Sequence, residues 1–160
     1  MLRKLLVERF GLTFHRESRE LPCFTLTVGK SGPKFNESTV SPDDSPTGAP
    51  PLIFVIFPNR ARLPGKYATM GDLAALLQRV VVGRPLVDKT GLNARYDFEL
   101  EFLPVESQFD GVLHLSTDSD EPAKPGLFAA LQEQLGLRLT ATKGPVEVLV
   151  LDRVNRPSEN

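Results

Sequence analysis

The stretch LFAALQEQLGLRLTATKGPVEVLVL, residues 127–151, repeats the pattern of residues 2–26 without a gap. Six identities hold the alignment, in which Leu2, Leu6, Glu8, Gly11, Leu12 and Leu26 match Leu127, Leu131, Glu133, Gly136, Leu137 and Leu151. Each copy places apolar residues at helical spacing, then a glycine, then apolar residues of strand character. Glycine readily adopts the left-handed conformation that ends a helix. The pattern therefore predicts a short helix, a glycine and two strands, present twice.

A third and looser copy lies in the middle of the chain. Thr69 and Asp72 have the spacing of a capping box, and Gly83 with Pro85 supplies the stop. The apolar stripe between them consists of Leu73, Leu76, Leu77 and Val80. After it we expect a short strand in RPLVD, a turn in DKTGLNA and a strand in YDFELEF, whose apolar and acidic residues alternate.

The three copies, residues 1–29, 61–103 and 125–154, predict an α+β fold with helices packed on one mainly antiparallel sheet. One helix-strand-strand unit cannot bury its own apolar stripe, so we expect a single domain, residues 1–160, with a shared core. Irregular loops rich in Pro, Ser, Asp and Gly are expected at residues 30–51 and 105–126.

Three further segments carry structural expectations. HRESRE, residues 15–20, is expected at the charged tip of a hairpin, in a solvated turn. VEVLVL, residues 146–151, is apolar at nearly every position and predicts a strand covered on both faces or in the sheet centre. LIFVIF, residues 52–57, is a candidate strand followed by a second strand around residues 62–68. Because an uncovered apolar strand promotes aggregation, we expect LIFVIF to be paired or buried.

Charge and composition exclude several functional classes. With 19 Lys plus Arg against 20 Asp plus Glu, the chain lacks the positive field that binds a nucleic-acid backbone. The longest apolar run, LIFVIF, is far shorter than the ~18 residues of a membrane span. The N-terminal MLRKLLVERF alternates charged and apolar residues and is no secretory signal, so the chain either stays inside the cell or is a piece of a longer protein.

No arrangement of residues indicates catalysis, a metal or a cofactor. GKSG, residues 29–32, lacks the earlier glycine of a phosphate-binding loop, since position 24 is Phe. His15, expected to face solvent on a strand, His114 and Cys23, expected to be a buried thiol, have no partners at metal-ligand spacing.

Two groups of polar residues leave a structural and a functional interpretation open. Asp97, Glu99 and Glu101 share one face of a strand, which favours a solvent-facing edge over paired carboxylates for acid–base chemistry or a cation. In the segment after the middle helix, Asp88 and Thr90 are expected to hydrogen-bond their own turn while Gly91 has a positive φ. The alternative is that this segment is an interaction loop, whose candidate residues are Arg84, Asp88, Lys89, Thr90 and Gly91.

The chain resembles the soil-associated family of acidobacterial paralogues, a domain of unknown function. The phrases that carry the resemblance are LLVERFGLTFHRESRELPCFTLTVGKSGPK, MGDLAALLQRVVVGRPLVDKTGLNARYDFELEF and LFAALQEQLGLRLTATKGPVEVLVLDRVNRPSEN. The family often has glycine where Ala94 stands, and LIFVIFP, within residues 36–66, departs from its pattern. The resemblance implies export to the periplasm, with an N-terminal segment that this chain lacks, and implies no catalytic residues.

Three functions compete at this level. The leading hypothesis is a non-enzymatic module of the cell envelope that binds a protein partner or a ligand, since the chain combines a repeated scaffold with polar loops and open sheet edges where a partner strand can add. Some relatives implied by the resemblance are fused to sensor proteins of the metallopeptidase antirepressor type, which makes a regulatory domain the first alternative. A hydrolase that uses the acidic row is the second.

Overall fold

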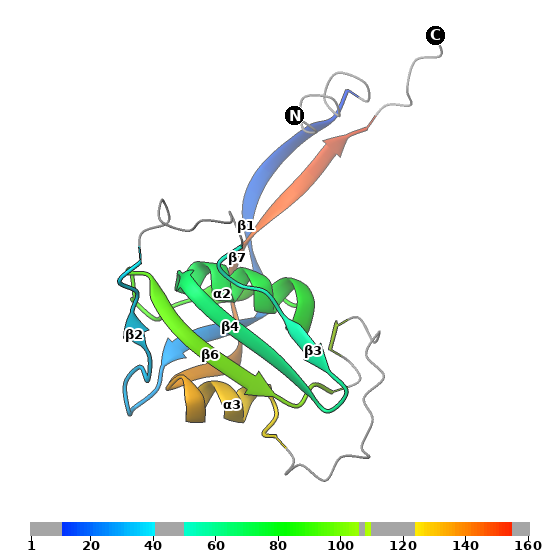
Figure 1. Ribbon diagram of the computed structural model, residues 1–160. Coiled ribbons are helices and arrows are strands. Elements are labelled where there is room, and N and C mark those ends of the chain that lie inside the picture. The colour runs from blue at the N-terminus through cyan, green and yellow to red at the C-terminus, as the bar shows by residue number, and fades with distance from the viewer. Residues whose placement is uncertain (1–10, 41–49, 106–107, 110–123, 155–160) are drawn as a thin grey trace. The chain divides into compact units, whose positions relative to one another are not determined.

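The computed structural model describes residues 11–40, 50–105, 108–109 and 124–154 (Figure 1). Contacts divide the chain into two compact units, of which one is Met1–Leu21 with Lys143–Asn160 and the other is Pro22–Thr142. The first is called the ribbon unit below and the second the core unit. The expectation of a single domain stays a prediction.

The described part of the chain forms two sheets. The four-stranded sheet has the order β2-β6-β4-β3, is antiparallel throughout, and consists of β2 (Asn36–Glu37), β3 (Val55–Phe57), β4 (Arg60–Ala68) and β6 (Tyr96–Phe102). The three-stranded sheet has the order β5-β1-β7 and consists of β1 (Thr13–Val28), β5 (Leu86–Asp88) and β7 (Leu137–Arg153). The helical elements are α2 (Met70–Leu77), the π-helical turn η2 (Gln78–Val82) and α3 (Leu127–Gln134).

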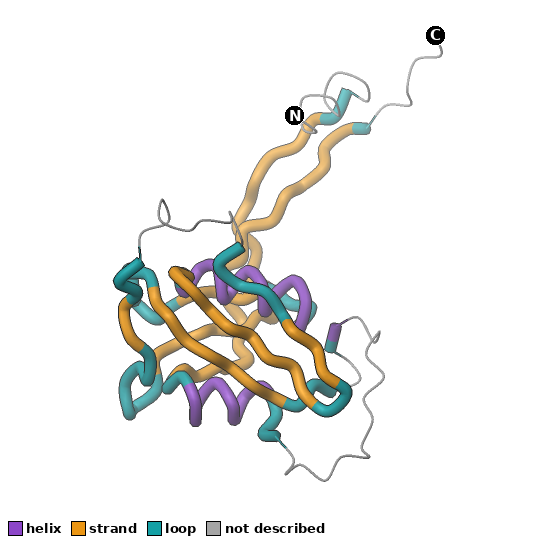
Figure 2. The backbone as a smooth tube through the Cα atoms, in the orientation of Figure 1, coloured by secondary structure: helices purple, strands orange, loops and turns teal. Residues whose placement is uncertain are grey.

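The predicted α+β fold, with repeated helix-strand-strand units under one sheet, is wrong. Figure 2 shows that most of the described chain is strand, with two short α-helices beside two sheets. The middle unit does not form a hairpin, because β5 pairs in parallel with β1 while β6 pairs with β4. In the outer units β1 and β7 each run on as one long strand, and they pair with each other. The helix predicted within residues 2–10 lies outside the described residues.

HRESRE is part of a strand and not the predicted hairpin tip. The segment contains no glycine, proline or asparagine, the residues that most readily reverse a chain. It continues within β1, and its charged side chains pair with residues of β7, as in His15–Asp152 and Arg16–Glu147. Opposite charges across neighbouring strands stabilise the extended pairing.

Predictions that depend on only a few neighbouring residues are confirmed. The Thr69 side chain accepts from the Asp72 N–H, and the Asp72 carboxylate accepts from the Thr69 N–H, which is the predicted capping box. Gly83 and Gly136 have φ of +57° and +66°, as expected for glycines that end helical segments. The last three residues of LIFVIF form β3, which pairs with β4, and Leu52 at its start forms a bridge to Gly65 of β4.

The core lies behind the four-stranded sheet, and α2 lies behind β4 and β6 in the view of Figure 1. The predicted alternation of β6 is confirmed, since its apolar side chains are buried while its acidic ones face the other way. Each main element of the core unit contributes fully buried side chains, which include Leu26, Leu63, Leu73, Leu77, Leu100, Phe102, Leu127, Leu131 and Leu137.

The segment GKSG, at residues 29–32, packs against the C-terminal end of α3. The N–H of Gly29 donates to the Gly136 carbonyl (2.8 Å), and the N–H of Lys34 donates to the Leu135 carbonyl (3.0 Å). Lys34 Nζ also donates to the Glu133 carbonyl (2.9 Å). The last carbonyls of a helix have no partner within the helix, so these donors satisfy them. Lys34, which follows GKSG, therefore caps the C-terminal end of α3, while Gly29 bonds Gly136, which follows the C-cap residue.

The described ribbon unit consists of the outer halves of β1 and β7. VEVLVL lies here on an edge strand, with Leu149 and Leu151 51% and 57% exposed, so the prediction of a strand covered on both faces or in the sheet centre is wrong.

An ionic contact within the ribbon unit predicts a pH dependence. The hydrogen bond between His15 Nδ1 and Asp152 (2.8 Å), followed by the charge of Asp152, raises the pKa of His15 above the 6.5 of a free imidazole. A raised pKa in the folded state stabilises the pairing below about pH 6.5, and this contribution is lost as the pH rises through the raised value. We expect an NMR titration to give His15 a pKa above 6.5, and Asp152→Asn to lower it.

Glu147→Gln is the matched control, since it removes a ribbon carboxylate that pairs with Arg16 and not with His15. An unchanged His15 pKa in Asp152→Asn, or an equal decrease in Glu147→Gln, would contradict the assignment.

Candidate functional site

The segment that the sequence leaves open between a turn and an interaction loop is a turn held by its own side chains. Asp88 Oδ1 accepts hydrogen bonds from the Thr90 N–H (2.9 Å) and from Thr90 Oγ1 (2.7 Å). Gly91 has a φ of +71°, and the Lys89 N–H donates to the Leu26 carbonyl (2.8 Å). The predicted turn chemistry is confirmed. It ties the end of β5 to β1.

An open hollow of about 750 Å³ lies between α2 and β5. Of the five candidate loop residues, Arg84 and Asp88 line the hollow. Lys89, Thr90 and Gly91 do not. Sequence reasoning missed the helical side, which is lined by Gly71, Ala74, Ala75, Gln78 and Arg79. The hollow therefore joins two segments that the sequence does not connect by any motif.

The shape of the hollow follows from how α2 is oriented. The buried side chains of Leu73 and Leu77 fix which way the helix faces, and the capping box fixes where it begins. The side toward β5 then carries Gly71, which has no side chain, and Ala75, whose side chain is a single methyl group, and this leaves space. The helix widens into the turn η2, and turns of this π-helical kind often occur at functional sites.

The charge around the hollow is positive. Arg79 and Arg84 both line it and are exposed, and within the described part of the chain neither side chain has an ion pair or hydrogen bond. The acid on the rim, Asp88, is hydrogen-bonded inside its turn. Guanidinium groups bind carboxylates through paired, charge-assisted hydrogen bonds. The two arginines are thus available to a carboxylate that enters the hollow.

The edge of β5 supplies backbone groups on the same side. The Pro85 carbonyl and the Lys89 N–H bond to β1, and backbone direction alternates along a strand, so the groups of Leu86 and Asp88 point away from β1. Gln78 Oε1 accepts the Leu86 N–H (2.8 Å). This bond occupies the Leu86 N–H, so the Leu86 carbonyl and the Asp88 backbone groups are the ones that an extended segment would meet, beside a floor of small residues and two cations that suit acidic side chains.

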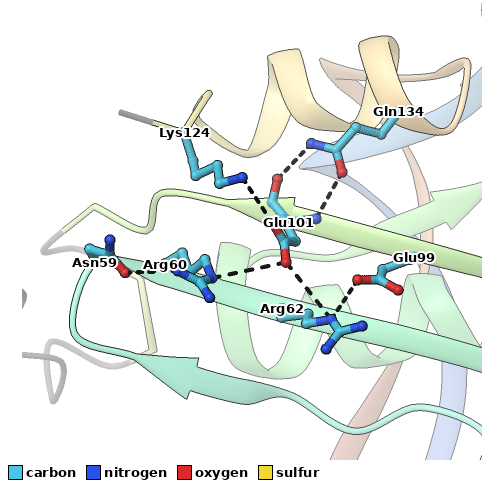
Figure 3. Close-up of polar contacts among 7 residues, drawn as sticks. All are labelled: Asn59, Arg60, Arg62, Glu99, Glu101, Lys124 and Gln134. Carbon is cyan, nitrogen blue, oxygen red and sulfur yellow. Dashed lines mark hydrogen bonds and ion pairs between the residues drawn. The ribbon is translucent and has the colours of Figure 1, made fainter. Parts of the chain in front are cut away.

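The acidic row of β6 is an ion-pair network and not a pair of catalytic carboxylates. Figure 3 shows Glu101 between Arg60, Arg62 and Lys124, with nitrogen–oxygen distances of 3.9, 3.8 and 3.1 Å. Glu99 pairs with Arg62, and Asp97 lies 3.4 Å from Lys66 Nζ. β6 pairs with β4 along its length but with β2 only at Tyr96 and Asp97, so the expected solvent-facing edge holds for the part of β6 that carries Glu99 and Glu101 and not for Asp97. Each carboxylate of the row has a cation beside it.

The pKa values in the row shift in the direction of ionised carboxylates. The hydrogen bond from Arg62 lowers the pKa of Glu99. Burial alone raises the pKa of Asp97, but hydrogen bonds from the Tyr67 N–H and from Ser38, together with Lys66, outweigh it and lower the pKa. A general acid near neutral pH needs a raised carboxyl pKa, so these two groups are unsuited to that role.

Gln134, which sequence reasoning also missed, closes part of the open edge of β6. Its side-chain amide donates to the Glu101 carbonyl (2.7 Å) and accepts from the Glu101 N–H (2.8 Å), as Figure 3 shows. β2 pairs only with Tyr96 and Asp97, so at Glu101 the Gln134 amide makes the two backbone hydrogen bonds that a neighbouring strand would make. No sequence motif marks this role, because it depends on where α3 packs.

Cys23 and His15, two further candidates, are not among the residues that line the hollow. Cys23 is buried, as predicted, and His15 is exposed in the ribbon unit, while His114 lies outside the described residues. Across the residues that the structure describes, no group of three His, Cys, Asp or Glu side chains could hold a metal ion. The described helices include none with the length and hydrophobicity of a membrane span.

Comparison with known proteins places the chain in a family. Residues 1–154 match the family described as "Protein of unknown function (DUF3738)". No curated protein and no solved structure gives a significant match. Because the match covers nearly the whole chain, the protein belongs to the DUF3738 family.

Proposed function

We propose that this chain is a non-enzymatic binding module of the cell envelope, which holds an extended acidic segment of a partner protein in the hollow between α2 and β5. One observation carries the proposal. Arg79 and Arg84 line an open hollow beside a strand edge, without an acidic partner in the described part of the chain. A carboxylate-bearing strand complements this surface in both charge and backbone hydrogen bonding.

The non-enzymatic part of the proposal is supported by the acidic row. Its carboxylates lie in ion pairs, and the pKa values of Asp97 and Glu99 are lowered. The location in the envelope, and membership of the soil-associated acidobacterial branch, are supported by the sequence resemblance described above. Both belong to the proposal.

An array of extended peptides tests the function. Peptides with alternating glutamate and small residues are compared with the same peptides in which glutamine replaces glutamate. We expect the acidic set alone to bind, and salt to weaken the binding, since the attraction is electrostatic. Arg79→Glu with Arg84→Glu is expected to weaken binding at least about tenfold, which corresponds to ~1.4 kcal/mol.

Arg138→Glu is the control, because it makes the same charge change at an exposed arginine of β7 that does not line the hollow. We expect it to leave peptide binding unchanged. If no acidic peptide binds, or if the control weakens binding as much as the paired variant does, the proposed function is wrong.

A further inference from the structure

Within the described part of the chain, the outer edge of β3 is unpaired, and its sequence is apolar. β3 is the last strand of its sheet, and its pairing with β4 extends in one register from Phe57↔Arg60 to the bridge Leu52↔Gly65. Between Pro51 and Pro58 the segment contains neither a charge nor a proline. Edge strands usually carry such residues, which prevent pairing with another chain. This edge lacks that protection.

Three apolar side chains along this edge remain exposed to solvent. Ile53, Val55 and Ile56 are 57%, 40% and 40% exposed. Leu52 is buried, and the Phe54 ring packs edge-on against Phe102 at 6.2 Å. Side chains alternate along a strand, so Leu52, Phe54 and Ile56 share the core face while Ile53 and Val55 share the opposite face. The prediction that LIFVIF is paired or buried therefore holds for the edge that pairs with β4 and for the face that carries Leu52 and Phe54.

The backbone direction at this edge follows from one hydrogen bond. The Lys66 N–H donates to the Pro51 carbonyl (3.0 Å), so residue 51 and the alternate residues after it direct their backbone groups to β4. Leu52, Phe54 and Ile56 must then direct theirs outward. They form the row that a further antiparallel strand would bond.

We propose that a second copy of this chain occupies the edge, with the two β3 edges paired antiparallel about a two-fold axis at Phe54. The segment is complementary to itself in this register. Leu52 pairs with the second copy's Ile56, and Phe54 pairs with its counterpart, so that all outward backbone groups are hydrogen-bonded. On the other face Ile53 lies opposite the second copy's Val55. Each exposed apolar side chain thus gains an apolar neighbour, as in an isologous interface.

Sedimentation equilibrium of the whole chain tests the inference, with two charge variants that differ only in sign at one position. The wild type is expected to approach twice the monomer mass as its concentration rises. Ile53→Glu with Val55→Glu places like charges opposite each other and is expected to weaken association at least about a hundredfold. Ile53→Glu with Val55→Lys places opposite charges together in this register and is expected to retain the dimer.

Both variants change exposed positions, and equal thermal unfolding of the two confirms that folding is intact. A wild type that stays monomeric at every concentration overturns the proposal. Equal association of the two variants overturns it as well, since only the two-fold register distinguishes them. Arg79→Glu with Arg84→Glu is expected to leave the mass unchanged, so failure of the peptide-binding function is separable from failure of the dimer.

Discussion

Replacing Gly136 by alanine is expected to destabilise the core unit by about 3–5 kcal/mol. Gly136 has a φ of +66°, where a side chain costs about 1–2 kcal/mol. A Cβ at this position would also lie 2.0 Å from the Gly32 carbonyl oxygen, a backbone atom that is held by the docking of residues 29–34 on α3. The new methyl group cannot be accommodated unless that segment moves and its hydrogen bonds break.

Gly83→Ala separates the two contributions. Gly83 has a φ of +57°, but nothing lies within 4 Å of an added Cβ, so this variant is expected to lose only about 1–2 kcal/mol. Urea unfolding, with the slope compared between variants, measures both free energies. Equal losses for the two variants would show that the contact with Gly32 has no energetic weight.

Features fixed by neighbours in sequence were predictable. The Thr69–Asp72 capping box, the turn at Asp88–Gly91 and the alternation of β6 each depend on a few consecutive residues. Their physical causes are a hydrogen bond across one helical turn, a side chain that bonds its own turn, and a two-residue period. Such causes act without reference to the rest of the chain.

Strand partners were not predictable, because they are chosen between distant segments. Residues 13–28 and 137–153 have a similar pattern of apolar residues. That similarity is compatible with two separate hairpins and equally with the single pair of long strands that the structure shows. Charges at His15 and Asp152, separated by 137 positions, support the shared pair. The choice depends on matching side chains across the ladder, which one sequence does not display.

The candidate site was half predictable for the same reason. Arg84 and Asp88 belong to a recognisable turn, but Gly71, Ala75 and Arg79 belong to the hollow only because α2 lies beside β5. One signal was present, since the helix carries small residues on the side away from its leucine stripe. An exposed helix face made of glycine and alanine leaves space for a ligand or for a packed neighbour, and the sequence does not distinguish the two.

Gly65→Val is expected to cost about 2–3 kcal/mol, although valine favours strands. Gly65 lies opposite Phe98 in the β4–β6 ladder, and a Cβ at residue 65 would lie 2.6–2.9 Å from three atoms of the Phe98 ring. The ring therefore covers the glycine and fills the volume of its missing side chain, an arrangement known to rescue glycines in sheets. Valine would push the ring out of a position where it is 8% exposed and packs on Phe35.

A double-mutant cycle isolates this contact from strand propensity. Phe98→Val removes the three ring atoms that approach residue 65 and keeps a β-branched residue in β6. In that background Gly65→Val has room for its side chain and gains a cross-strand valine pair, so we expect it to cost nothing or to stabilise slightly. The coupling between the two positions is then about 2 kcal/mol or more, measured from urea unfolding of the four proteins. If Gly65→Val costs the same in both backgrounds, the ring is not what requires a glycine at residue 65.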